Sequence, residues 1–197
     1  KKILYKDWIY EWLIEKREYI KESTYANYSN NIFNHIIPKL GEYSLAEIDH
    51  KILQEFLLDL FKNGKSNRNG GLSEKTIKDI SIILKGSLKK AINEGKMKHI
   101  ELTFHYPKSN IEKKIYILTK KEQNKITDYV IDNLSSKNIG LLISLYSGIR
   151  IGELCALKWE DIDFKKSLIC INKTMQRIYI KDKSDNTSKI IITSPKT

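Results

Sequence analysis

Apolar residues recur at intervals of three and four over most of the first 95 positions, which predicts amphipathic helices. Leu4, Trp8 and Trp12 share one face of the first, over about residues 3–20. Ser23 is a suitable N-cap for the second, and Pro38 is expected to end it. Ser44-Leu-Ala-Glu47 has the form of a capping box. Two further helices follow, over about 50–61 and from Ser73 to about 94.

The last of these four main helices has two contrasting faces. At about 100° per residue, its apolar positions fall within about 80° of one another. They are Ile77, Ile80, Leu84, Leu88 and Ala91, and four lysines gather on the opposite side: Lys75, Lys78, Lys85 and Lys89. Such a face suits contact with phosphates, although a solvated lysine surface gives the same pattern.

The pattern changes in the second half of the chain. Residues 96–117 lack steady periodicity, and Tyr106-Pro-Lys-Ser indicates a linker over 106–117. Helices return after a capping box at Thr119, and beyond Phe164 a period of two predicts strands near 167–172, 176–180 and 189–193. The sequence therefore predicts a mainly α protein with a small β-sheet, divided into units 1–105 and 118–197.

Composition and charge narrow the function classes. The chain has 197 residues, of which 41% are apolar and 30% charged, as in globular proteins. Its net charge of +11 favours a polyanionic partner, although a lysine-rich surface without such a partner is the alternative. Apolar runs are too short to span a bilayer, and Cys155 and Cys170 fall in apolar contexts that indicate reduced core residues. We expect a cytoplasmic protein.

A turn at residues 147–150 carries the clearest candidate chemistry. Gly148 stands where a left-handed residue ends a helix, and Arg150 follows in the turn before a short second helix. Ile151, Leu154 and Cys155 are expected to face the core from that helix. An arginine fixed between two buried helices suits a phosphate, and Glu153, three residues on, could hold its guanidinium. A purely structural Arg–Glu pair is the alternative.

The run from Ser147 to Asp163, Ser-Gly-Ile-Arg-Ile-Gly-Glu-Leu-Cys-Ala-Leu-Lys-Trp-Glu-Asp-Ile-Asp, resembles the first arginine box of the tyrosine recombinases, the phage and conjugative-transposon integrases. Three upstream phrases follow the order and spacing of that family's core-binding domain: Ser-Thr-Tyr-Ala-Asn-Tyr, His-Ile-Ile-Pro-Lys-Leu-Gly and Gly-Leu-Ser-Glu-Lys-Thr-Ile. The final Pro-Lys-Thr is similar to the β-hairpin tip that carries the family's catalytic lysine, which would be Lys196.

The resemblance implies a four-helix, SAM-like core-binding domain over 1–105, a linker over 106–117, and the N-terminal part of an α+β catalytic domain over 118–197. Arg150 would bind the scissile phosphate, Glu153 would support it, and Lys196 would act as general acid. The lysine face, with Tyr25 and Tyr28, would contact duplex DNA. The family uses no metal or nucleotide cofactor, and we expect no metal site.

The implied function is site-specific DNA recombination or integration of a mobile element, with self-association as dimer or tetramer on DNA. The family's His-x-x-Arg box and tyrosine nucleophile lie downstream of the hairpin lysine and are not found in these residues. We therefore expect this chain alone to bind DNA without cleaving it. A non-catalytic DNA-binding regulator or excision accessory protein on the same fold is one alternative, and a basic RNA-associated protein is another.

Overall fold

The computed structural model describes residues 2–65, 70–108, 115–183 and 186–195, which form two compact units. Unit 1 comprises Lys1–Glu112 together with Tyr179–Ser188, and unit 2 comprises Lys113–Ile178 together with Lys189–Thr197. In the described part of the chain no helix combines the length and apolar character needed to cross a membrane.

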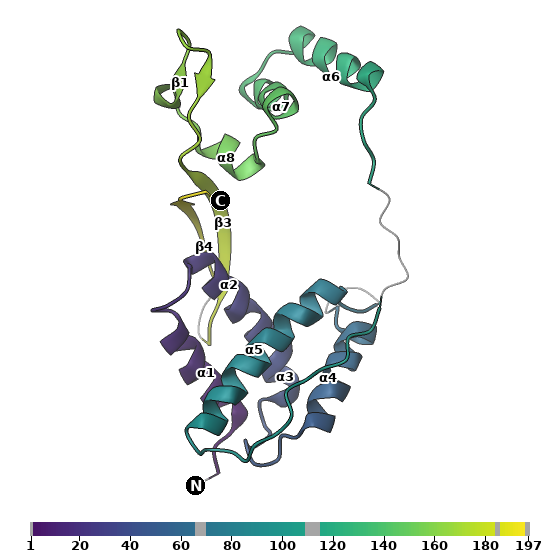
Figure 1. The fold of residues 1–197 in the computed structure, drawn as a ribbon, viewed down its shortest axis with the longest axis vertical. Coiled ribbons are helices and arrows are strands. Elements are labelled where there is room, and N and C mark those ends of the chain that lie inside the picture. The colour runs from purple at the N-terminus through teal and green to yellow at the C-terminus, as the bar shows by residue number, and fades with distance from the viewer. Residues whose placement is uncertain (1, 66–69, 109–114, 184–185, 196–197) are drawn as a thin grey trace. The chain divides into compact units, whose positions relative to one another are not determined.

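Unit 1 is a helical bundle (Figure 1). Its helices are α1 (Tyr5–Lys16), α2 (Glu22–Asn31), α3 (Ile37–Leu40), α4 (His50–Asn63) and α5 (Glu74–Asn93). The apolar stripe predicted for α5 is buried at every position and packs with Trp8, Leu53 and Leu57 of α1 and α4. The predicted four-helix core is therefore confirmed, with α3 as a short additional turn.

Two helix boundaries differ from the sequence expectation. α2 begins at Glu22 and its N-cap is Lys21, without a side-chain cap, so the assignment of Ser23 as the cap is wrong. Pro38 does not end the second helix, because a π-helical turn over Ile32–Ile36 leads directly into α3. Proline is tolerated there because it stands in the first turn of α3, where backbone N–H groups lack helical acceptors in any case.

Other local predictions are confirmed. The Ser73 side chain accepts from the N–H of Thr76, and Gly95 ends the stretch after α5 with a φ of 68°. The capping box at Ser44 is confirmed only in part: the carboxylate of Glu47 accepts from the N–H and the hydroxyl of Ser44 at 2.8 and 2.7 Å, but the segment forms a turn and no helix begins there. These features depend on residues close in sequence, which is why the local pattern predicts them.

A short polar chain crosses the core of unit 1. The Tyr5 hydroxyl lies 2.8 Å from Oγ of Ser87, and that hydroxyl in turn donates to the carbonyl of Leu84 at 3.1 Å. The indole N–H of Trp8 donates to the carbonyl of Ser87 at 2.9 Å. Burial raises the pKa of the Tyr5 phenol well above its usual range. α1 is thereby fixed against the middle of α5 by hydrogen bonds as well as by packing.

The segment after α5 packs back on the bundle. Gln54 exchanges two hydrogen bonds with the backbone of His105, at 2.9 and 3.0 Å, and Phe104 is buried. The Tyr106 hydroxyl lies 2.8 Å from Oγ of Ser81. The absence of periodicity over 96–106 thus reflects an extended segment laid along α4 and α5, and Tyr106 belongs structurally to unit 1.

Residues Tyr179–Ser188 group with unit 1 through contacts near the C-terminal end of α2. Asn30 donates to the carbonyl of Tyr179 at 2.6 Å, and Lys181 donates to Oδ1 of Asn34 at 2.8 Å. Lys183 Nζ lies 3.8 Å from the ring centroid of Tyr10, and Ile180 packs against the apolar core. A lysine of this segment is therefore engaged by an aromatic ring of α1.

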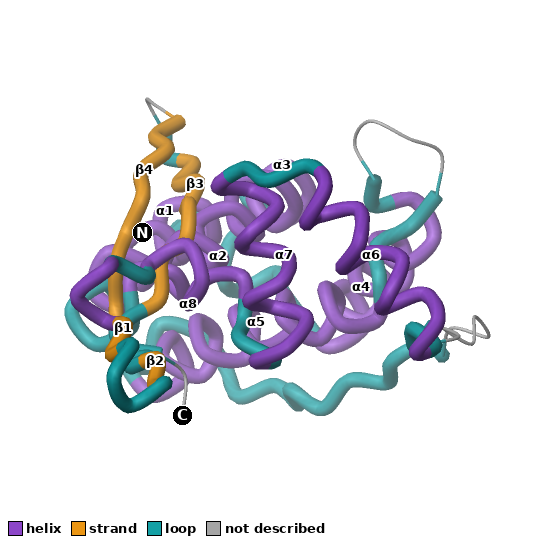
Figure 2. The backbone as a smooth tube through the Cα atoms, turned by 90° about the horizontal axis from the view of Figure 1, so that it is seen from above, coloured by secondary structure: helices purple, strands orange, loops and turns teal. Residues whose placement is uncertain are grey.

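Unit 2 contains short helices, one small sheet, and residues 174–178 and 189–193 of a second sheet, whose remaining residues belong to unit 1. The helices are α6 (Lys120–Asp132), α7 (Ser136–Ser147) and α8 (Ile151–Ala156), followed by a 3₁₀ turn over Trp159–Asp161. β1 (Ile162–Asp163) pairs antiparallel with β2 (Leu168–Ile169), and β3 (Thr174–Lys181) pairs with β4 (Asn186–Thr193). Figure 2 shows β3 and β4 side by side, as expected for strands joined by only four residues.

The predicted strand over 167–172 is shorter than expected, because only residues 168–169 pair, and they pair with β1. Apolar side chains on unit 2 are widely exposed, including Ile151, Ile169 and Ile171. Cys155 and Cys170 are free, as predicted, but both are exposed, so their placement in a core is wrong. The physical reason is that no described element covers the apolar faces to which they belong.

Candidate functional site

The turn between α7 and α8 presents Arg150. Gly148 ends α7 in the left-handed conformation, with φ 69° and ψ 12°, as its position in the sequence predicts. Arg150 is then the N-cap of α8 in extended backbone, φ −71° and ψ 147°. The sharp change from helix to extended backbone turns the chain, and it leaves the arginine side chain 72% exposed.

Glu153 holds Arg150 at two points. One carboxylate oxygen accepts from the guanidinium Nη1 at 2.9 Å, and the other accepts from the Arg150 backbone N–H at 3.1 Å. Both bonds, the guanidinium first, hold the pKa of the Glu153 carboxyl below its usual range. The prediction that Glu153 reaches back to Arg150 is confirmed. Within the described residues the guanidinium bonds through Nη1 alone, which uses one of its five donors and leaves the others for a further acceptor.

The expected surroundings of this arginine differ from the structure. Glu153 and Ala156 are the buried residues of α8, whereas Ile151 is 73% exposed. The arginine therefore lies on an open surface and not between two buried helices. The helical period is right, but the face chosen for the core is wrong, because α8 turns its acidic N3 residue inward.

An open hollow of about 410 Å³ adjoins Arg150 and Glu153, and residues 174–176 of β3 line its other side. α8 comes very close to β3 here. A Cβ on Gly152 would lie 2.5 Å from Oγ1 of Thr174 and 3.0 Å from the carbonyl oxygen of Met175. Only glycine permits this approach. The sequence offered no signal for it, because the two segments are more than twenty residues apart.

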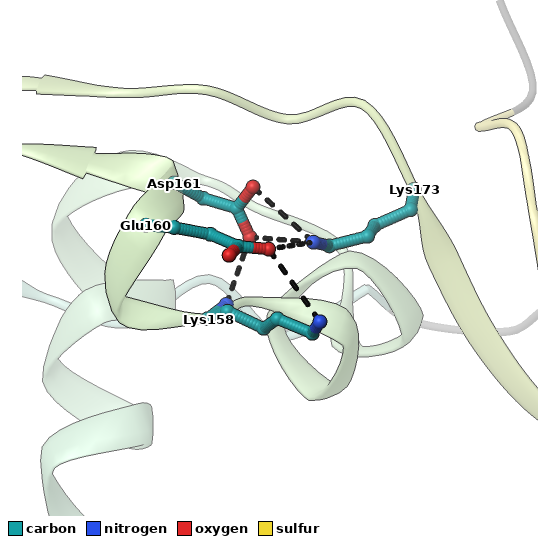
Figure 3. A network of polar contacts seen from close by, with 4 residues as sticks. All are labelled: Lys158, Glu160, Asp161 and Lys173. Carbon is teal, nitrogen blue, oxygen red and sulfur yellow. Dashed lines mark hydrogen bonds and ion pairs between the residues drawn. The ribbon is translucent and has the colours of Figure 1, made fainter.

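A polar network follows α8, and Figure 3 shows its four side chains. Lys173 Nζ lies 2.9 and 3.2 Å from the two carboxylate oxygens of Asp161, which also accepts the Lys158 N–H at 2.8 Å. Glu160 adds ion pairs with Lys173 at 3.7 Å and Lys158 at 3.5 Å. The sequence analysis assigned no role to Asp161 or Lys173, although Asp161 lies in the run that resembles the arginine box.

The four lysines predicted on α5 do not have equivalent surroundings. Lys78 pairs with Glu74 at 2.7 Å and lies 5.7 Å from the ring centroid of Tyr106. Lys85 lies 5.3 Å from the ring centroid of Phe104 and is half-buried. Lys75 and Lys89 are exposed. Half of the predicted basic face thus borders the returning segment 101–106.

Tyr25 and Tyr28 are placed by packing. Tyr25 is 5% exposed, with the Arg17 guanidinium 5.0 Å from its ring centroid, and burial raises its pKa. Tyr28 stacks on Trp12 at 5.9 Å between centroids. Tyr25 is thus buried, whereas Tyr28 is half-buried with one face of its ring against Trp12. Lys196 lies outside the described residues.

No group of three or more His, Cys, Asp or Glu side chains within the described ranges has the arrangement of a metal site. The charged groups gathered around α8 are instead one arginine, two lysines and three carboxylates. Their chemistry is ion pairing and, at Arg150, hydrogen-bond donation toward an anion.

Two family descriptions match the chain. Residues 4–61 match the N-terminal SAM-like domain of phage integrases, and residues 113–191 match the phage integrase family itself. The first falls within the bundle of unit 1, and the second includes Arg150, Glu153 and the Asp161–Lys173 pair. The two matches have the order that the sequence motifs predict.

Known proteins agree with this assignment. The chain is 28% identical over 200 residues to a "Tyrosine recombinase XerC-like" protein of Caldanaerobacter subterraneus subsp. tengcongensis, with 97% of this chain and 49% of that protein covered. A "Tyrosine recombinase XerA" of Pyrococcus horikoshii is 34% identical over 113 residues, covering 49% of this chain and 36% of that protein. The chain thus spans about half the length, or less, of these curated relatives.

Solved structures show the same fold. A Tn1549 transposon integrase in complex with a circular intermediate DNA superposes with a TM-score of 0.72 at 20% identity, covering 99% of this chain and 58% of that one. A lambda integrase dimer bound to a COC′ core site gives a TM-score of 0.66 at 22% identity, covering 97% and 49%. Together the two family descriptions show that the chain belongs to the phage integrase family, and its curated relatives are named tyrosine recombinases.

Proposed function

We propose that this chain binds duplex DNA and supplies the first catalytic residues of a recombinase that breaks and rejoins DNA strands at specific sites. The observation that carries the proposal is the state of Arg150. Its guanidinium is oriented by a buried carboxylate and yet is 72% exposed. An ion pair with an exposed partner contributes little to stability, and the exposed side of Arg150 leaves guanidinium donors that can reach a further anion.

Arg150 would act on the phosphate at which the DNA strand is cut. Its planar fork donates to two oxygens of one phosphate, and the negative charge on those oxygens grows as a nucleophile attacks phosphorus. Glu153 keeps the fork from rotating, so the donors need no reorganisation during the reaction. Lys196 would donate the proton to the leaving 5′ oxygen.

The attacking group would be a tyrosine outside these 197 residues, as in the family that the chain resembles. Charge stabilisation of this kind comes from side chains, and the proposal therefore includes no metal or nucleotide cofactor. Loss of members of such a catalytic set is far from additive, so Arg150 and Lys196 without a nucleophile give no measurable cleavage.

Duplex DNA is the proposed partner because the positive charge is shared by both parts of the chain. Residues 1–105 hold 18 basic and 14 acidic residues, and residues 106–197 hold 17 and 10. Lys75, Lys78 and Lys89 are exposed on the α5 face, and because Lys78 pairs with Glu74, Lys75 and Lys89 are the first candidates for phosphate contact. The solved relatives include a lambda integrase tetramer bound to a Holliday junction, and we propose self-association on DNA here as well.

The test uses a nicked suicide substrate that traps a covalent protein–DNA adduct. The present chain and the protein encoded by the complete reading frame are compared. We expect an adduct from the complete protein, its loss on Arg150→Ala, and duplex binding that changes little. Lys165→Ala removes one exposed positive charge from the same unit and should leave the adduct intact.

Two results would contradict the proposal. An adduct formed by residues 1–197 alone would place the nucleophile within this chain. A complete protein that binds duplex DNA but forms no adduct would favour a non-catalytic DNA-binding protein on the same fold.

A further inference from the structure

Asp161 and Lys173 stand at the two ends of the segment that contains β1 and β2. Asp161 closes the 3₁₀ turn after α8, and Lys173 immediately precedes β3. Lys173 Nζ lies 2.9 and 3.2 Å from the two Asp161 carboxylate oxygens (Figure 3). The pair therefore closes a loop of eleven intervening residues and brings the start of β3 back to the end of the α8 region.

Every polar atom of Asp161 that can accept is engaged. Its carboxylate also accepts the Lys158 N–H at 2.8 Å, and its backbone carbonyl accepts the Cys170 N–H at 2.8 Å. The residue is 6% exposed. A buried carboxylate with this many partners depends on each of them, since removal of one leaves a charge without compensation.

The Lys173 ammonium is held by two carboxylates. Its side chain is 23% exposed and faces Asp161 and Glu160. Bonding to the Asp161 carboxylate raises the pKa of Lys173 and, with the Lys158 N–H, lowers that of Asp161. Both groups thus stay charged across the neutral range. An ammonium held by two carboxylates is poorly placed to bind a DNA phosphate as well.

β3 packs closely against Gly152 of α8, the helix that begins at Arg150. Thr174 directly follows Lys173, and its Oγ1 lies against the bare Cα of Gly152, two residues after the arginine. The Met175 carbonyl oxygen borders the same Gly152 position. No side chain on α8 separates the helix from the strand there, so a displacement of β3 is transmitted directly to the helix that carries Arg150.

We propose that Asp161 and Lys173 are positioning residues for Arg150, because their ion pair fixes β3 against α8. This inference rests on the proposed recombinase function. The pair touches no reacting atom. It acts by holding the surface on which the guanidinium and its Glu153 partner are mounted, and a displacement of about 1 Å at a reacting group can reduce a rate about 100-fold.

The first test needs only the present chain. Amide hydrogen exchange is measured for Lys158, Cys170 and residues 151–156, in the wild type and in Asp161→Asn. Asparagine keeps the shape and can still accept the Lys158 N–H, but it loses the charge that holds Lys173. We expect at least about tenfold faster exchange in residues 151–156. Lys173→Met should reproduce the effect, and Lys173→Arg should largely restore protection.

A matched control lies in the same loop. Lys166 and Asp163 form an exposed pair, 3.8 Å apart with side chains 74% and 41% exposed. Lys166→Met removes a positive charge from an ion pair in the same segment, but neither Lys166 nor Asp163 adjoins β3 in the chain as Lys173 does. We expect unchanged exchange in residues 151–156 for this variant.

The second test uses the protein from the complete reading frame. The rate of covalent adduct formation should fall between about 10- and 100-fold in Asp161→Asn and in Lys173→Met. It should recover in Lys173→Arg and stay unchanged in Lys166→Met. The double variant Asp161→Asn/Lys173→Met should be no slower than the worse single variant, since both changes break one contact.

DNA binding separates positioning from phosphate contact. If Lys173 bound a phosphate, Lys173→Met would lower the log–log salt slope of duplex affinity by about 0.9, and Asp161→Asn would not. We expect the same slope in wild type and both variants. A lowered slope for Lys173→Met alone, or adduct rates at wild-type level in both variants, would overturn the inference. Absence of an adduct from the wild-type complete protein would instead refute the proposed function.

Discussion

The polar chain through the core of unit 1 makes a quantitative prediction about stability. Tyr5 is fully buried, and its hydroxyl has Ser87 Oγ, 2.8 Å away, as its hydrogen-bond partner. Because Ser87 Oγ donates to the Leu84 carbonyl, the tyrosine is the donor in the first bond. The two obvious deletions are therefore not equivalent, although each removes one hydroxyl group.

Tyr5→Phe removes a donor and leaves Ser87 bonded to Leu84, so it should reduce the free energy of unfolding by about 1 kcal/mol. Ser87→Ala removes the acceptor and leaves a buried phenol without a partner, which should cost about 2–3 kcal/mol. With both hydroxyls gone, no polar atom is orphaned. The double variant should accordingly cost less than the sum of the two single variants, by about 1 kcal/mol or more.

Denaturant unfolding followed by tryptophan fluorescence measures these differences. Trp8 and Trp12 are each 3% exposed in unit 1, whereas Trp159 of unit 2 is 81% exposed, so the change in fluorescence reports mainly on unit 1. Ser23→Ala is a matched control, because Ser23 is half-buried and does not cap α2. It should change stability by less than about 0.5 kcal/mol.

The reasoning fails if Ser87→Ala costs no more than Tyr5→Phe, because the penalty of an unpartnered buried phenol would then be absent. Additive effects in the double variant would fail it equally, since they would show that the two hydroxyls stabilise the bundle independently.

Three further predictions can be checked on the same chain. Duplex affinity should fall with salt, and replacing exposed Lys75 and Lys89 by alanine should lower the log–log slope by about 1.8; a flat salt dependence in the wild type would contradict phosphate binding. Limited proteolysis should cut between Tyr106 and about residue 115, because Tyr106 is anchored to the bundle; cuts confined to 20–60 would contradict the two-unit division. Hydrogen bonds from Ser44, together with Lys2, lower the pKa of Glu47 to about 2. The ionised Glu47 side chain therefore stabilises unit 1 fully at pH values above its unfolded pKa of about 4.3. This contribution is lost as the pH falls toward about 2. Acid titration of Glu47→Gln should lack that component, and an unchanged titration would exclude it.

The local elements of the fold were predictable because their causes lie within a few residues. The side chains of Ser73 and Thr119 cap their helices by accepting the backbone N–H of the residue three positions later in the chain. Gly148 adopts the left-handed conformation that its place after α7 requires. The Arg150–Glu153 pair belongs to the same class, since residues three apart on a helix turn meet whatever surrounds them. The family resemblance rests on this stretch for the same reason.

Contacts between distant segments were decided only by the tertiary structure. The return of residues 96–106 along α4 and α5 depends on Gln54 and Ser81, which carry no periodic signal. The Asp161–Lys173 pair joins residues twelve apart across the segment that contains β1 and β2, and the sequence alone does not distinguish these two charges from others on the surface.

Burial was the property that local pattern predicted least well in unit 2. Helical spacing in α8 identified Ile151 and Cys155 as inward residues, yet both are exposed and Glu153 is buried. Periodicity shows that a helix has two faces, but which face is covered depends on what packs against it. Capping, turns and the arginine pair were therefore set by the sequence itself, whereas the approach of β3 to Gly152 and the surroundings of Arg150 were set by segments that meet only in the folded chain.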